Sequence, residues 1–390
     1  MGNLINLKLK NFIKKRQCTL LGVGPMSKNC VDAAIELSND FEVPIMLIAS
    51  RRQIDSDQFG GGYVNNWSTP KYAEYVFSKD KKGKIILCRD HGGPWQSLVE
   101  VNKNMGLKEA MQSAKDSYTE DIKSGFEILH IDPSIDIHTK PSQEEILERV
   151  FELYEYCWIE SEKYKKEITF EVGTEEQSGM TNSQEELDYT LEKIRKFCKS
   201  NKLPIPLFVV IQSGTKVLEM ENVGSFDTPI RKVNEIPVEI QLPKVIEICH
   251  KHEVLMKEHN CDYLSDESLE WHPRLGIHAS NVAPEFGVAE SKALLKLLTE
   301  NNLNSIKEEI MKISYESKKW EKWLKTNSLK TDQEKSILCM HYVFSNPEVK
   351  RLKEKAKKEL ESKSIFLDDY LKESIKKSIT KYLYNFNIIQ

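Results

Sequence analysis

Several features that mark common classes of protein are missing from this chain of 390 residues. No apolar run approaches the ~20 residues that a membrane-spanning helix needs, so we expect no membrane association. The net charge is −4, and the absence of a basic excess argues against nucleic acid as a partner. None of the eight cysteines belongs to a CxxC pair, so neither a zinc finger nor a disulfide framework is predicted.

Targeting signals and nucleotide-binding loops are also missing. The first 17 residues are basic but contain no continuous apolar segment and no small-residue cleavage site, so no secretory signal is predicted. Together with cysteines that we interpret as buried reduced thiols, this favours a cytoplasmic location. No P-loop is present, and the residues after Gly22 and Gly24 do not complete a dinucleotide-binding fingerprint.

The sequence does contain a series of short apolar runs, and each ends in polar residues of types that can bind a ligand or transfer a proton. Amphipathic helical stretches separate them, and this alternation predicts repeated β/α units around a parallel sheet. Eight such runs occur, which is the number in a closed (β/α)₈ TIM barrel. They lie at 19–24, 45–50, 85–91, 128–134, 168–175, 208–214, 254–260 and 275–281.

The last hundred residues have a different character from the rest. They are rich in Lys, Glu and Leu and carry no strand signals. We therefore expect a barrel over residues 1–290, preceded by a lead-in helix, and an α-helical C-terminal extension over 291–390 that packs on the barrel.

In such a barrel the carboxyl ends of the strands form one face, and the active site lies there. The polar residues at these ends should therefore converge although they are far apart in sequence. These candidates are Asp90, His91, Asp132, Glu175, Gln212, His259, His278 and Asn281.

The segment RDHGGPWQ (89–96) is the sharpest of the motifs. Adjacent residues of a strand point to opposite faces, but a bulge or turn after Leu87 would let Asp90 and His91 both reach the pocket. His91 suits a metal ligand, and Asp90 suits a general acid/base or a partner of the ligand, with Asp132 as a second candidate. The alternative is a strand-end histidine that is satisfied by hydrogen bonds.

Three of the strand-end residues form a two-histidine, one-carboxylate set: His91, Glu175 and His259. Such a set suits a divalent metal, zinc or manganese, with open positions for a substrate oxygen. Glu175 also suits a catalytic base. Each histidine taken alone has a structural explanation, and the prediction depends on their coincidence at strand ends.

A long glycine-rich loop follows the second strand, at 57–70. Its three consecutive glycines permit close backbone approach, so Gln58, Gly61 and Tyr63 are candidates for a loop that closes over a substrate. An ordinary flexible connection explains the loop equally well.

Taken together, QFGGGY (58–63), DHGGPWQ (90–96), SGFEILHIDPS (124–134), VGTE (172–175) and KEHNCDYLS (257–265) resemble a known family. The chain is similar, over roughly 40–290, to the accessory (GatZ/KbaZ-type) subunits of tagatose-bisphosphate aldolase, which are related to class II aldolases. The resemblance implies a TIM barrel and a zinc-assisted reaction in which a ketose-phosphate carbonyl is polarised and an enediolate forms. Aldol cleavage or condensation, and epimerisation, share that intermediate.

The resemblance also implies residue roles and an alternative. His91 and His259 match metal-binding histidines, Asp90 the catalytic carboxylate, Glu175 the GTE carboxylate, and Asn281 a substrate-binding amide. Where class II aldolases supply another metal-binding histidine, this chain has QSGTKV with Lys216. A non-catalytic subunit that stabilises a partner class II aldolase is therefore the alternative to an enzyme acting on a sugar or sugar phosphate. Self-association into a homo-oligomer is also open.

Overall fold

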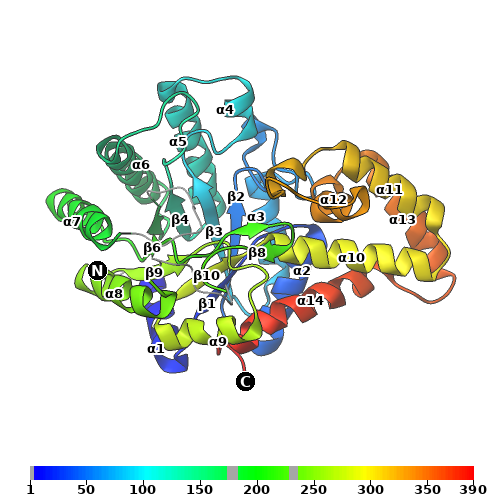
Figure 1. The fold of residues 1–390 in the computed structure, drawn as a ribbon. Helices are drawn as coiled ribbons and strands as arrows, with labels where there is room; N and C mark the ends of the chain where they lie inside the picture. Colours follow the sequence, from blue (N-terminus) through cyan, green and yellow to red (C-terminus); the bar gives the residue numbers. More distant parts are fainter. Residues whose placement is uncertain (1–3, 174–182, 228–235) are drawn as a thin grey trace.

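The computed structural model describes residues 4–173, 183–227 and 236–390, and at its centre lies a closed barrel of eight parallel strands (Figure 1). The strands follow one another around the barrel in the order β1-β10-β9-β6-β5-β4-β3-β2. Their bounds are Leu20–Val23 (β1), Ile45–Ser50 (β2), Ile85–Gly92 (β3), Ile128–Ile131 (β4), Thr169–Val172 (β5), Phe208–Val210 (β6), Leu255–Glu258 (β9) and Ala279–Val282 (β10). The prediction of a (β/α)₈ TIM barrel is confirmed.

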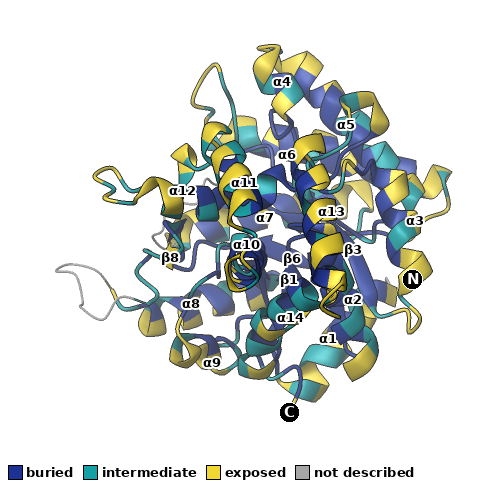
Figure 2. Ribbon diagram, turned by 90° about the vertical axis from the view of Figure 1, so that its right-hand side faces the viewer, coloured by how far each residue is buried: buried dark blue, intermediate teal, exposed yellow. Residues whose placement is uncertain are grey.

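Helices connect successive strands and cover the outside of the barrel. Their buried sides face the strands and their exposed sides face solvent (Figure 2). They are Lys28–Phe41 (α2), Thr69–Lys79 (α3), Leu98–Asn102 (α4), Leu107–Ser124 (α5), Gln143–Lys163 (α6), Gln184–Asn201 (α7), Val238–Lys251 (α8) and Asp266–Leu275 (α9), with Leu4–Arg16 (α1) ahead of the first strand.

The helix ends follow the capping signals of the sequence. Ser142 caps α6 by accepting a hydrogen bond from the backbone N–H of Glu145, and the Glu145 side chain accepts one from the Ser142 N–H in return. Gly125 ends α5 in the left-handed conformation, at φ 88°, which a residue without a side chain adopts at low cost.

A short hairpin interrupts the regular alternation after β6. Its strands are Val217–Leu218 (β7) and Glu221–Asn222 (β8). Thr215, just before the hairpin, donates its hydroxyl to the carbonyl oxygen of His259 at 2.6 Å. The hairpin is thereby fastened to the chain that follows β9.

The helical extension leaves the barrel and then returns to it. It comprises Pro284–Glu300 (α10), Asn304–Glu316 (α11), Asp332–Cys339 (α12), Pro347–Glu361 (α13) and Leu367–Asn385 (α14), with short 3₁₀ turns at Glu321–Trp323 (η2) and Met340–Val343 (η3). Helices α10 to α13 project to one side in Figure 1, whereas α14 runs back along the barrel and packs against α2, α9 and β1. Ile375, Ile379 and Leu383 of α14 belong to the main hydrophobic core. The division of the chain at 290/291 stays a prediction.

Two further observations concern the sequence expectations. All eight cysteines are buried and none is paired with another. Within the described ranges, every helix is too short or too polar to cross a lipid bilayer.

Candidate functional site

A β-bulge in β3 brings Asp90 and His91 to the mouth of the barrel together. Arg89 pairs with Leu129 of β4, but Gly92 pairs with Ile131, so β3 contains one residue more than its partner over this stretch. His91 occupies the extra position with φ at 44°, a conformation that residues with side chains rarely adopt. Without the bulge, adjacent side chains would point to opposite faces. A strained backbone of this kind is typical of functional sites.

A fully buried ion pair holds the base of this segment. Arg89 makes two hydrogen bonds to Asp121 of α5, at 2.7 and 2.5 Å, and the side chains of both residues are inaccessible to solvent. The remaining guanidinium nitrogen donates to the carbonyl oxygens of Ala49 and Ile54 at 2.8 and 2.7 Å. Because each charged nitrogen has a partner, the pair fixes β3 against α5 immediately before Asp90.

Two histidine rings face each other across the mouth, and each is oriented by a carboxylate. His91 Nδ1 lies 2.7 Å from Asp132 Oδ2, and His259 Nε2 lies 2.9 Å from Glu171 Oε1. The ring nitrogens that remain, His91 Nε2 and His259 Nδ1, are 3.3 Å apart. A carboxylate on one ring nitrogen directs the lone pair of the other toward a metal, which is the usual arrangement around metal-binding histidines.

This separation fits two nitrogen ligands of one ion. Nitrogens at ~2.0–2.1 Å from a tetrahedral zinc ion lie ~3.3–3.4 Å from each other. Two overlapping groups of ligand atoms, each with all members within 4.8 Å of one another, surround the same place. The first is His91, His130 and His259, and the second is Asp90, His130, Glu171 and His259.

Without a metal, a proton occupies the space between the two rings. Burial opposes the charge on His91, but Asp90 and Asp132 raise its pKa to about 9, so this ring is protonated at neutral pH. Burial lowers the pKa of His259, so its ring is neutral. His91 Nε2–H therefore donates to His259 Nδ1 in the metal-free protein.

Asp90 is ionised beside this pair and accessible from the mouth. Burial alone would raise its pKa, but the positive charge of the nearby His91 holds the pKa well below its usual range. Asn281, at the end of β10, donates its amide to Asp90 Oδ1 at 3.2 Å. The amide oxygen of Asn281 is buried and has no hydrogen-bond partner among the described residues.

Behind the histidines lies a buried ion pair in the barrel interior. Lys257 of β9 donates to Glu171 Oε2 of β5 at 2.6 Å, and both side chains are about 1 % exposed. Burial would raise the pKa of Glu171, but Lys257 and the neighbouring imidazoles lower it to about 2. Glu171 is thus a permanent anion that bridges Lys257 and His259.

His130 completes the group from β4. Its Nδ1 accepts the backbone N–H of His91 at 3.1 Å, which supports the bulged conformation. Its Nε2 is buried without a hydrogen-bond partner among the described residues, and a side chain on Gly173 would lie 2.5 Å from it. The glycine of the VGTE motif therefore makes room for this ring.

The structure brings five of the predicted residues to this site: Asp90, His91, Asp132, His259 and Asn281. Gln212 follows β6 and is buried near the same face. Glu175, predicted as a ligand and a catalytic base, lies outside the described residues.

Other predicted residues lie elsewhere. His278 precedes β10, at the end of the strand opposite to Asn281, where its Nδ1 accepts the N–H of Met256. Gln58 donates to Asp116 on the outer helix α5. Tyr63 packs edge-on against Tyr342 of the extension, with ring centroids 4.9 Å apart. At Gly61, φ is +71°, which explains the glycine by backbone conformation.

Three residues of the site are not among the strand-end candidates of the sequence: Glu171, His130 and Lys257. A signal was present for two of them. Glu171 and Lys257 each interrupt an apolar strand, and a charged residue there needs a partner, either on a covering helix, as Arg89 has in Asp121, or in the barrel interior.

No family model and no curated protein matches the chain. Solved structures do. A probable tagatose 6-phosphate kinase from Sinorhizobium meliloti 1021 superposes with a TM-score of 0.74 at 16% identity, over 94% of this chain and 100% of that one. The fructose-bisphosphate aldolase of Campylobacter jejuni has a TM-score of 0.55 at 12% identity, over 99% of this chain and 94% of that one. At such low identities these likenesses show a shared fold alone, a TIM barrel with helices after it.

Proposed function

We propose that this chain is a metal-dependent, class II aldolase-like enzyme that acts on a sugar or ketose phosphate through an enediolate. The reaction is aldol cleavage or condensation, or epimerisation. One observation carries the proposal. His91 Nε2 and His259 Nδ1 face each other at 3.3 Å, each ring is oriented by a carboxylate, and the ionised Asp90 lies beside them.

The metal would be a divalent ion, zinc or manganese, held by His91 and His259. Glu171 belongs to the same group of ligand atoms as His259 and is a described carboxylate that can add an oxygen ligand, and Glu175 stays a predicted ligand. When bound, such an ion supplies Lewis-acid polarisation of a substrate carbonyl.

The chain's own residues supply the proton transfer and the positioning. Asp90 is ionised, so its carboxylate can take a proton from the carbon next to the carbonyl and return it later. Asn281 holds Oδ1 of Asp90, and its own unpartnered amide oxygen can accept a hydrogen bond from a substrate hydroxyl. Asp132 and Glu171 keep the two histidine rings in position.

The second candidate is a non-catalytic subunit that stabilises a partner class II aldolase. The Lys257 ammonium favours it, because a buried cation 2.6 Å from Glu171 neutralises a carboxylate of the site and repels a divalent ion.

The test is turnover by the protein alone. The zinc- or manganese-loaded chain is incubated with a panel of ketoses and ketose phosphates, and NMR follows cleavage products and epimers. The Asp90→Asn variant is the control for contaminating enzymes. We expect at least one substrate to be converted by the wild type and not by the variant. No conversion across the panel, with co-purification of a second aldolase chain, would establish the subunit function instead.

A further inference from the structure

The segment between α11 and α12 lies on the face of the barrel that carries the site. Glu219, in the hairpin that follows β6, donates its backbone N–H to the carbonyl oxygen of Trp323 at 2.9 Å. Its carboxylate accepts the N–H of Lys325 at 3.0 Å. The hairpin is in turn bonded to the chain after His259, because Asn222 donates to the carbonyl oxygen of Asn260 at 2.9 Å.

The 3₁₀ turn η3, which follows α12, contacts the loop that follows β2. The ring of Tyr342 packs against Tyr63, and the backbone N–H of Tyr63 donates to the carbonyl oxygen of Arg52 at 3.1 Å. In the closed order of the barrel, three strands separate β2 from β6 in either direction. The extension therefore reaches two opposite sides of the rim around the mouth.

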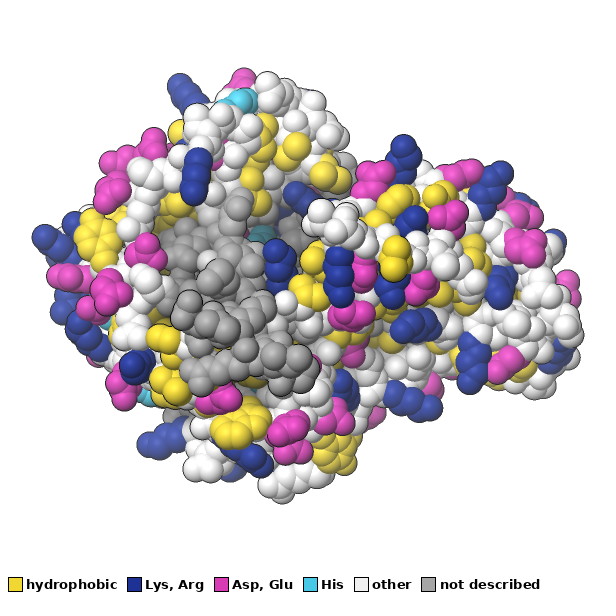
Figure 3. Space-filling model, in the orientation of Figure 1, with side chains coloured by type: hydrophobic (Ala, Val, Ile, Leu, Met, Phe, Trp, Pro, Cys, Tyr) yellow, Lys and Arg dark blue, Asp and Glu magenta, His cyan; other side chains and the backbone are white. Residues whose placement is uncertain are grey.

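Three cations gather on this part of the rim: Arg52, Lys319 and Lys322. Lys322 Nζ lies 4.7 Å from the ring centre of Trp323 and 5.2 Å from that of Tyr342. Lys319 Nζ donates to the carbonyl oxygen of Tyr342 at 3.1 Å. Both lysine residues keep surface exposed to solvent, but their ammonium groups lie beside the ring of Tyr342, which shields them in part. Figure 3 shows basic side chains along the border between barrel and extension, beside a deeply set histidine.

These cations are not neutralised by the protein. Within residues 4–173, 183–227 and 236–390, none of the three has a carboxylate within 4.0 Å. Burial, together with the charges of Arg52 and Lys319, lowers the pKa of Lys322 to about 8. Like charges held together in this way favour the binding of an anion.

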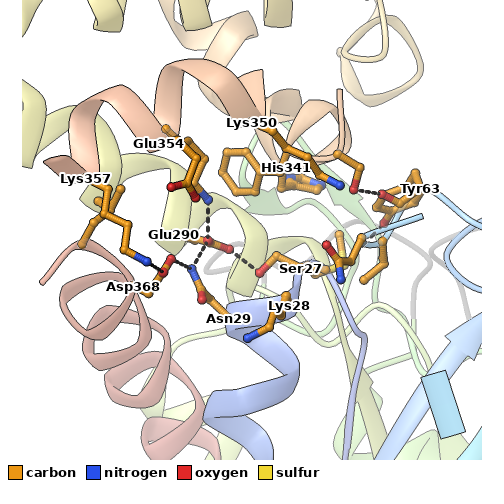
Figure 4. A pocket seen from close by; sticks show the side chains of 17 residues that line it. Ser27, Lys28, Asn29, Tyr63, Glu290, His341, Lys350, Glu354, Lys357 and Asp368 are labelled. Carbon is orange, nitrogen blue, oxygen red and sulfur yellow. Dashed lines mark hydrogen bonds and ion pairs between the residues drawn. The ribbon is translucent and has the colours of Figure 1, made fainter. Parts of the chain in front are cut away.

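Two lysines elsewhere on the extension, Lys353 and Lys357, do have carboxylate partners. A pocket of about 570 Å³ between barrel and extension is also lined by lysines (Figure 4). There Lys353 lies 3.7 Å from the buried Glu290, and Lys357 lies 3.3 Å from Asp368. Carboxylates already occupy the places where an anion would bind, so we interpret this pocket as a polar contact between the barrel and the extension.

We propose that Arg52, Lys319 and Lys322 form a subsite that binds the phosphate group of the substrate, so that the C-terminal extension takes part in substrate recognition. This inference rests on the proposed function, because it assumes that a sugar derivative binds at the mouth. Three cations match a phosphate dianion better than a single carboxylate. The aromatic rings restrict the lysine side chains, so less entropy is lost when the anion binds.

The first experiment measures binding of inorganic phosphate to the full, metal-free chain at pH 7 by calorimetric titration. Lys322→Gln removes the charge and keeps much of the side-chain stem. We expect its Kd for phosphate to rise on the order of tenfold. The matched control is Lys325→Gln in the same segment, whose ammonium is already paired with Glu221 at 2.6 Å. The control should bind phosphate like the wild type, and a urea titration checks that both variants are folded.

Three outcomes would overturn the subsite: no phosphate binding by the wild type, equal effects of the two substitutions, or tighter Lys322-dependent binding of glucuronate than of phosphate. The turnover assay tests the proposed function independently of the subsite. Turnover of an unphosphorylated ketose without phosphate binding would refute the subsite alone. Lys322-dependent phosphate binding without turnover of a sugar would support the subsite and refute the enzymatic function.

Discussion

Replacing Lys257 by Met should lower the stability of the protein and strengthen its binding of metal. The ammonium of Lys257 is 2.6 Å from Glu171 Oε2, and both side chains are about 1 % exposed. Removal of one partner of a buried pair typically costs about 3–5 kcal/mol, because a charge is left without compensation. Glu171 keeps its bond to His259 at 2.9 Å, so we expect the lower end, about 3 kcal/mol.

The same substitution should change metal affinity in the opposite direction to stability. Loss of a cation from the interior leaves Glu171 as an uncompensated anion beside the two histidines, and an uncompensated anion attracts a divalent ion. Zinc affinity should therefore rise although the fold is weakened. Urea unfolding of the metal-free chain gives the first quantity, and a zinc titration gives the second.

Two further variants make this prediction sharp. Lys257→Met combined with Glu171→Gln should recover much of the lost stability, because neither charge is then left alone. Lys216→Met replaces a lysine that lies outside this pair and should change neither quantity. The reasoning would be refuted by a loss of stability below about 1 kcal/mol for Lys257→Met, or by a fall in its zinc affinity.

Three other predictions concern Asp90, Asp132 and His341. Asp90→Asn should reduce turnover ~10²–10⁴-fold while the bound metal, measured by elemental analysis, is retained; unchanged turnover would exclude Asp90 as the acid/base. Asp132→Asn should weaken zinc binding ~10–100-fold in a calorimetric titration, because His91 loses its orienting carboxylate, and an unaltered Kd would contradict that function. Burial, followed by the charges of Lys322 and Lys319, lowers the pKa of His341 to about 3, so the folded protein keeps this ring neutral while the unfolded chain protonates it below about pH 6.5. This contribution to stability is complete above pH 6.5 and is lost as the pH falls, by about 2 kcal/mol at pH 5. His341→Phe should remove that loss. If the urea midpoints of the wild type and the variant changed with pH in the same way, the pKa of His341 would be ordinary.

The barrel could be predicted because its strands are marked by both composition and spacing. The end of β3 is the clearest case, since Asp90, His91 and the glycines after them indicate a turn at the mouth. The bulge that brings both side chains inward was one of two possibilities from the sequence. The register shift between β3 and β4 now identifies it.

Other parts could not be read from a linear pattern. His278 and Asn281 belong to one apolar run, and the run does not say which residue begins the strand, so His278 is at the opposite end. Nor does helical periodicity tell which helix covers a given strand. The wall next to β1 is covered by α14, about a hundred residues after the barrel has closed, because its apolar face fits between α2, α9 and α10.

The central claim is that one divalent ion binds between His91 and His259. Equilibrium titration of the metal-free chain with zinc, with His259→Ala as the comparison, tests it most directly. The account predicts one tight site per chain in the wild type and its loss in the variant. Equal zinc binding by the two proteins would contradict it.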